Sequence, residues 1–118
     1  MRRRKLRLAL VAAPALFSGL ALGACGSSAS DSLGHQACVQ VSRSLKTYAR
    51  SQQTSGAERA KLVSQANVEL REALPQAGLA ASSDTDWQAL AATLSESSRV
   101  AEGNLVTALT AQCAETLS

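Results

Sequence analysis

The stretch Cys38-Val39-Gln40-Val41-Ser42-Arg43-Ser44-Leu45-Lys46-Thr47-Tyr48 carries the pattern that decides the fold class. One set of its side chains recurs at alternating spacings of three and four residues, which is the period of a helix face. The members of this set are Cys38, Val41, Leu45, Tyr48 and, further on, Gln52. Arg43, Lys46 and Arg50 fall outside it and are expected to point outward. The pattern predicts a helix near residues 33–52, and since no later segment alternates like a strand, the fold class is predicted to be all-α.

A second helix is predicted to begin at Ser55-Gly56-Ala57-Glu58. This is a capping box, in which the side chains of Ser55 and Glu58 satisfy each other's backbone amides. The apolar stripe that follows consists of Val63, Ala66, Leu70, Ala73, Leu74 and Ala77. Pro75 and Gly78 predict either the end of this helix or a kink in it.

A third helical run opens at Thr85-Asp86-Trp87-Gln88, which again resembles a cap. Its apolar side is formed by Trp87, Leu90, Ala91 and Leu94. The pattern loses its large apolar residues across residues 95–99 and resumes with Leu105, Leu109, Cys113 and Thr116. One long helix and two shorter helices both fit this period.

The first residues have the features of a targeting segment. A cationic start, made by Arg2, Arg3, Arg4, Lys5 and Arg7, precedes a mostly apolar stretch from Leu8 to Leu22. These are the n-region and the h-region of a secretory signal. The stretch is shorter than the ~20 residues of a bilayer span and contains Pro14, so a permanent membrane helix is the second interpretation. The Arg3-Arg4 pair leaves open whether export follows the twin-arginine route.

Directly after the apolar run, Leu22-Gly23-Ala24-Cys25 resembles the lipobox of bacterial prolipoproteins. The resemblance implies a thioether-linked diacylglycerol on Cys25, cleavage between Ala24 and Cys25, and often a further acyl chain such as palmitate on the new amino terminus. Each buried CH₂ contributes about 0.8 kcal/mol, so two or more chains anchor a protein stably. The alternative is a secreted protein with a chance cysteine near its cleavage site.

Three segments are therefore expected. Residues 1–24 are the lipoprotein signal peptide, residues 25–32 are the lipidated cysteine with a flexible Gly/Ser-rich tether, and residues 33–118 are the helical domain. An alanine-rich helical domain with one cysteine near each end, carried on a tether, is similar to small lipoproteins of high-GC Gram-positive bacteria. This resemblance implies a position on the outer face of the bacterial cytoplasmic membrane, held through the covalent lipid, and it implies no particular activity.

Processing would reverse the charge of the chain. Five of the 12 Lys and Arg lie in residues 1–24 and no acid does, so the remaining 94 residues carry 7 basic and 9 acidic side chains. Their formal charge is −2, whereas that of the whole chain is +3. A nucleic-acid partner is not expected, because it would require a clustered basic face with stacking aromatics.

Cys38 and Cys113 remain once Cys25 is lipidated, and in an exported protein such a pair predicts a disulfide. In a three-helix, up-down-up bundle the two would lie at opposite ends, whereas the Cα atoms of a disulfide lie within ~7 Å. A break near residues 97–104 gives an up-down-up-down order and returns Cys113 to the end that holds Cys38. We expect a small antiparallel four-helix bundle stapled by this disulfide. A three-helix bundle with a long last helix is the alternative.

Catalytic chemistry is not expected. His35 is the single histidine and C-x-x-C is absent, so neither a metal site nor a serine nucleophile with its base is predicted. Glu69 and Glu72, near Arg71 or Arg99, are expected to form a solvated, salt-bridging surface. No catalytic, cofactor-binding or metal-binding residue is assigned.

Two functional classes fit these observations. The first is a non-enzymatic interaction or envelope-structural module, with an envelope protein as the candidate partner. The alternative is a small-ligand binder, which would require a closed apolar pocket near Trp87 or Tyr48. An exposed apolar patch without a cavity would favour the first class.

Overall fold

The computed structural model describes residues 29–117, and every regular element in this range is helical. A first helix, here the N-terminal helix, covers residues 29–51. The later helices are α2 (Gly56–Glu72), α3 (Leu74–Ser83), α4 (Gln88–Ser95) and α5 (Val106–Leu117). Single 3₁₀ turns are formed by Thr85–Trp87, Glu96–Ser98 and Glu102–Asn104. The predicted all-α class is confirmed for this part of the chain.

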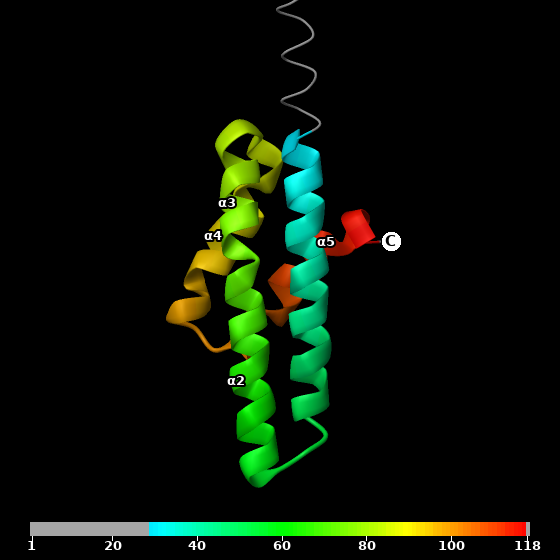
Figure 1. Cartoon of the computed structure of the whole chain (residues 1–118), viewed down its shortest axis with the longest axis vertical. Coiled ribbons are helices and arrows are strands. Elements are labelled where there is room, and N and C mark those ends of the chain that lie inside the picture. Colours follow the sequence, from blue (N-terminus) through cyan, green and yellow to red (C-terminus); the bar gives the residue numbers. More distant parts are fainter. Residues whose placement is uncertain (1–28, 118) are drawn as a thin grey trace, which may run out of the picture.

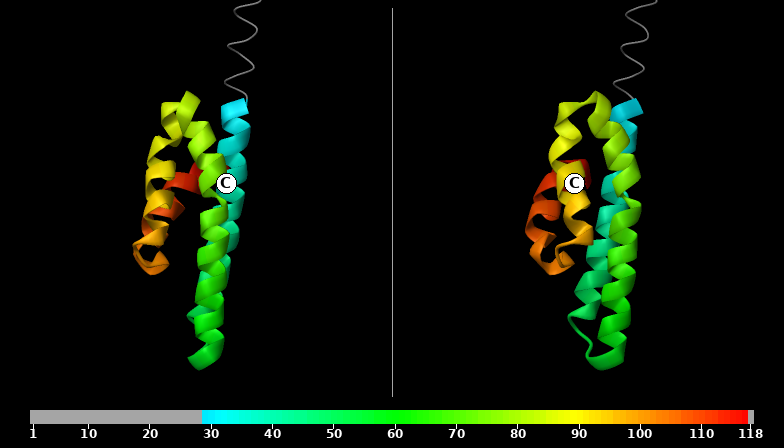
Figure 2. Two further views of the ribbon diagram at one scale, coloured as in Figure 1. Left: turned by 60° about the vertical axis from the view of Figure 1, so that its left-hand side comes forward. Right: turned by 90° about the vertical axis from the view of Figure 1, so that its left-hand side faces the viewer.

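The N-terminal helix and the α2–α3 pair form a long antiparallel hairpin, which stands vertically in Figure 1. α4 packs against α3 and ends about half-way along the hairpin. α5 then returns and crosses the N-terminal helix obliquely, so that its end lies on the side of that helix away from α4 (Figures 1 and 2). The half of the hairpin nearest residues 52–55 extends beyond α4 and α5 (Figure 2).

Small side chains line the interior of the hairpin. On the N-terminal helix the buried positions recur every three or four residues: Ser30, Gly34, Ala37, Cys38, Val41, Ser44, Thr47 and Ser51. On α2 and α3 the buried positions are Ala66, Leu70, Ala73, Ala77 and Ala80. Short side chains let two helix backbones approach closely, and the hydroxyl oxygens of Ser30 and Ser83 lie 2.5 Å apart across the hairpin. Larger apolar volume comes from α4, from α5 and from the residue just before α5, through Leu90, Leu94, Leu109 and Leu105.

The N-terminal helix includes residues 29–32, which we expected in the flexible tether. The tether prediction is wrong for these four residues, because Ser30 lies in register with the buried stripe and contacts Ser83. Gly and Ser composition predicts a flexible linker only where no side chain is buried. Residues 1–28, which include the predicted signal peptide and Cys25, lie outside the described range.

Both predicted capping boxes differ from the structure. Ser55 is the N-cap of α2, but its side chain makes no capping hydrogen bond. Gly56, next to it, has a φ of +62°, in the left-handed region that favours glycine, so the backbone makes this turn. At the second site the cap is Asp84, whose carboxylate accepts a hydrogen bond from the Asp86 backbone amide at 2.9 Å.

The predicted interruptions of the helices are confirmed. α2 and α3 are separated only by Ala73, and Pro75 lies in the first turn of α3, where its missing amide hydrogen costs little. The last helical run breaks into α4 and α5, with 3₁₀ turns and Val100-Ala101 between them. A single long last helix, our alternative, is not formed.

The predicted pairing of Cys38 with Cys113 agrees with the structure. Their sulfur atoms lie at disulfide distance, their Cα atoms are 5.5 Å apart, and both side chains are buried in the main apolar cluster. The bond joins the N-terminal helix to α5, whose oblique crossing brings Cys113 to Cys38. It closes a loop with a sequence separation of 75 residues.

Reducing this disulfide should destabilise the fold substantially. On the loop-entropy account a crosslink over such a distance restricts the unfolded chain by about 4 kcal/mol. We expect reductant to lower the Tm, followed by circular dichroism, by roughly 10 °C or more, since each kcal/mol corresponds to about 4–8 °C in a domain of this size. The variant with Cys38→Ala and Cys113→Ala is the control, and its Tm should not respond to reductant. An unchanged melting curve for the reduced wild type would contradict the staple.

A second stability prediction concerns Gly34. The Trp87 indole packs on it so closely that an added Cβ would overlap the ring, whereas a Cβ added at Gly78 would meet nothing within 4 Å. Gly34→Ala should therefore lower the free energy of unfolding by about 1–3 kcal/mol. Gly78→Ala, in the exposed part of α3, should raise it by about 0.5–1 kcal/mol. Urea titrations of both variants measure the free energy of unfolding. Equal values for the two variants would show that the packing of Trp87 does not require a glycine at position 34.

Candidate functional site

The most unusual chemical group in the described part of the chain is the carboxyl of Glu102. It lies in the 3₁₀ turn before α5, and only 3% of its surface is exposed. Charged side chains are almost never fully buried unless they are paired. Glu102 therefore needs a physical explanation, and its surroundings provide one.

Three segments of the chain meet at this carboxyl. Ser44 comes from the buried stripe of the N-terminal helix, and its Oγ lies 2.7 Å from Oε2 of Glu102. The same Oγ lies 2.6 Å from the main-chain carbonyl oxygen of Ala66 on α2. Because Ser44 and Ala66 are both small, the two helices approach closely enough for one hydroxyl to reach the backbone of the other helix. Ser44 thus links both helices of the hairpin to the turn before α5.

Two oxygen atoms, the carbonyl of Ala66 and Oε2 of Glu102, lie within hydrogen-bond distance of the Ser44 hydroxyl, which has one proton to donate. A hydroxyl donates one hydrogen bond and accepts others. When Ser44 donates to the carbonyl of Ala66, Glu102 can complete the contact only as a carboxylic acid that donates to Ser44 Oγ. A carboxylic acid at Glu102 can therefore keep both contacts, whereas a carboxylate can accept from Ser44 only when Ser44 no longer donates to Ala66. The other carboxyl oxygen, Oε1, is buried without a hydrogen-bond partner, which also disfavours a charge there.

The pKa of Glu102 is shifted in the same direction. Burial raises the pKa of Glu102 above its ordinary value of 4.5, and the neighbouring carboxylate of Glu69 on α2 raises it further. The hydrogen bond with Ser44 acts in the opposite sense, because it favours the carboxylate. Burial is the largest of the three effects, so Glu102 holds its proton to a higher pH than an exposed glutamate.

This pair of acids does not form a metal centre. Glu69 and Glu102 are the two carboxyl groups in the cluster, and residues 29–117 contain no group of three or more His, Cys, Asp and Glu side chains able to hold a metal ion. His35, the single histidine of the chain, is exposed, and Cys38 is bonded to Cys113.

The aromatic residues fill gaps between helices. Trp87 covers Gly34 near one end of the hairpin, and the hydroxyl of Tyr48 lies against Gly103 further along it. The two rings therefore do not line a common cleft. The hollow beside Trp87 has a volume of about 420 Å³ and is lined mainly by polar residues, Asp86, Gln112, Glu115 and Thr116. The closed apolar pocket that a small-ligand binder requires is not found at this place.

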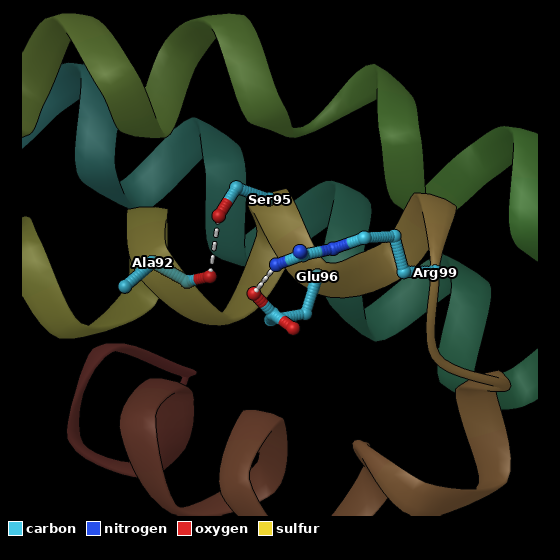
Figure 3. A network of polar contacts seen from close by, with 4 residues as sticks. All are labelled: Ala92, Ser95, Glu96 and Arg99. Carbon is cyan, nitrogen blue, oxygen red and sulfur yellow. Dashed lines mark hydrogen bonds and ion pairs between the residues drawn. The ribbon is translucent and has the colours of Figure 1, made fainter.

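The predicted acidic surface is arranged differently from our expectation. Arg99 forms an ion pair with Glu96, its neighbour in the preceding 3₁₀ turn, and Ser95 donates a hydrogen bond to the Ala92 carbonyl oxygen at 2.7 Å (Figure 3). Glu69 instead raises the pKa of the buried Glu102 through charge repulsion. Its neighbour Glu72 stays exposed. No sequence pattern points to Glu102, because this residue lies in a segment without helical periodicity.

The raised pKa of Glu102 predicts how stability depends on pH. The folded state binds the Glu102 proton more tightly than the unfolded state, so this contribution is complete below about pH 4.5 and is lost as the pH rises through the folded-state pKa. Glu102→Gln keeps a neutral group of similar shape and should remove that loss. The Tm of this variant relative to wild type should therefore increase with pH.

Glu72→Gln is the matched control, because it removes one exposed acid from the neighbouring helix. Its Tm difference from wild type should stay nearly constant over the same pH series. A difference that fails to increase with pH for Glu102→Gln would show that Glu102 is charged in the folded protein.

Comparison of the chain with protein-family models, with curated proteins and with solved structures found no match. Within residues 29–117, no helix has both the length and the apolar character needed to cross a bilayer.

Proposed function

We propose that this protein is an extracytoplasmic lipoprotein, anchored through Cys25 to the outer face of the bacterial cytoplasmic membrane. It displays an antiparallel four-helix bundle that serves as an interaction or envelope-structural module. The observation that carries this proposal is the order of a cationic start, an apolar run and Leu22-Gly23-Ala24-Cys25. In this proposal α2 and α3 act as one interrupted helix of the bundle.

The arrangement of the other two cysteines supports export. Cys38 and Cys113 are paired and buried, so Cys25 is the cysteine left over for lipidation. Stable disulfides form in oxidising compartments and are rare in the cytosol. The pairing therefore fits a domain that folds after leaving the cytoplasm.

The polar groups of the domain favour a binding role over catalysis. Ser44 and Glu102 are buried and bonded to each other, where no substrate reaches them. His35 is exposed on the N-terminal helix. Covalent catalysis requires at least a nucleophile and a base within hydrogen-bond reach of each other and open to the substrate, and these residues do not provide such a pair. We infer that the domain acts by presenting its surface to a partner in the cell envelope.

Replacing Cys25 tests the anchor. In cells fed a labelled fatty acid, Cys25→Ser should abolish incorporation of label into the protein and should leave the precursor unprocessed or release the protein from the membrane, because serine cannot form the thioether. Cys113→Ser is the control, since it removes a cysteine from the folded domain and should leave labelling intact. Labelling that persists in Cys25→Ser would refute the proposed anchor.

A further inference from the structure

Positive and negative side chains are separated along the hairpin. We call residues 43–61 the hairpin tip. They contain five Lys and Arg and one acid, Glu58, which gives a formal charge of +4. The other described residues carry two Arg and eight Asp or Glu, for a formal charge of −6. The tip cations are Arg43, Lys46, Arg50, Arg59 and Lys61.

The tip cations are available to an external anion. All five are exposed, and within residues 29–117 none is ion-paired with a carboxylate. Arg43 donates a hydrogen bond to Gln40 Oε1 at 3.3 Å. Arg59 donates to the main-chain carbonyl oxygens of Ser51 and Gln52, at 3.0 and 3.3 Å. These neutral partners leave the positive charges uncompensated.

The cations are spread over the surface. Arg43, Lys46 and Arg50 are spaced three and four residues apart on one face of the N-terminal helix, over about 10 Å of its length. Arg59 and Lys61 lie on the adjacent first turns of α2. Such a surface offers no enclosed site for one small anion. It fits a chain on which negative charges recur.

The opposite end of the hairpin is acidic. Residues 29–42 and 72–98 contain no Lys or Arg. The contact between Ser30 and Ser83 brings Asp31 and Asp84 to this end. Along the N-terminal helix, Arg43 lies 12 residues and Arg50 lies 19 residues beyond Asp31, or about 18 and 28 Å at the helical rise of 1.5 Å per residue.

We propose that the hairpin tip binds an anionic polymer of the cell envelope whose charges are phosphate groups. The planar guanidinium of arginine matches phosphate oxygens in a two-pronged geometry. The aromatic residue of the tip, Tyr48, is half-buried beside Gly103, so nucleobases would find no stacking platform. The recurring negative charges, and not bases between them, are therefore the feature that the tip recognises, and phosphate is the anion that we propose.

The separation of charge favours a polymer over the lipid surface. The direction of the tip rests on the proposed function, because Cys25 lies only six residues before Asp31 and would hold the acidic end nearest the membrane. The field of an anionic membrane decays within about 8 Å at physiological ionic strength. Tip cations held roughly 18 to 28 Å further out along the helix axis lie beyond that field.

Fluorescence anisotropy with labelled inorganic polyphosphate of uniform length tests this proposal. The protein is isolated from the envelope of producing cells in detergent, and its mass shows whether residues 1–24 and their cations remain. Two variants lower the net charge equally: Arg43→Gln with Arg50→Gln in the tip, and Arg71→Gln with Arg99→Gln outside it. We expect the tip variant to weaken binding roughly tenfold or more and the control variant to change it less than about threefold. Affinity should also fall steeply between about 50 and 200 mM salt.

Equal weakening by the two variants would overturn the proposal, because binding would then follow net charge alone. Tighter binding to anionic than to neutral vesicles that is lost in the tip variant would overturn the choice of a polymer and assign the tip to a membrane surface. If the protein bound neither polyphosphate nor anionic vesicles measurably at physiological salt, both the polymer and the membrane surface would be excluded as targets of the tip. A mass that shows an unprocessed, unacylated chain would refute the lipid anchor separately, since both variants carry the same leader and their comparison would stand.

Discussion

The close approach of the two long helices is the constraint on which the rest of the structure depends. Positions that face each other across the hairpin hold Ser, Gly, Ala or Thr more often than a large apolar residue. Trp87 occupies the space left by the missing side chain of Gly34. Ser44 reaches the carbonyl of Ala66 for the same reason. A larger residue at these positions would separate the helices and displace α4, the turn at Glu102 and α5.

Small residues also limit how much apolar surface the hairpin buries by itself. Burial contributes about 25 cal/mol per Å² of apolar surface, and an alanine side chain offers little area. The domain compensates in two ways. Leucines of α4, of α5 and of the turn before α5 cover one part of the hairpin, and the Cys38–Cys113 bond fastens α5 to the N-terminal helix. The part near the hairpin tip stays narrow and highly charged, so its side chains are available to a binding partner.

Much of this fold could be predicted because helices impose a regular period on their buried residues. The spacing of Cys38 and Val41, the break after Leu94 and the pairing with Cys113 all follow from that period together with disulfide geometry. The candidate site could not be predicted in this way. Glu102 lies where the period is interrupted, and Ser44 occupies a core position as a polar residue, so only the three-dimensional packing brings them together. The start of the N-terminal helix was missed for a related reason, since the burial of Ser30 depends on Ser83, 53 residues away.

The disulfide also determines how the domain responds to being cut. The turn at residues 52–55 and the exposed residues Ser98, Arg99 and Ala101 between α4 and α5 are accessible to a protease, and both places lie between Cys38 and Cys113. A protease that cleaves either connection once opens the chain without releasing a fragment, because the bond still joins the part before the cut to the part after it. A nicked domain would keep both pieces attached to whatever holds its amino terminus. Shedding from a surface would require cleavage before Cys38, or reduction of the bond as well as a cut.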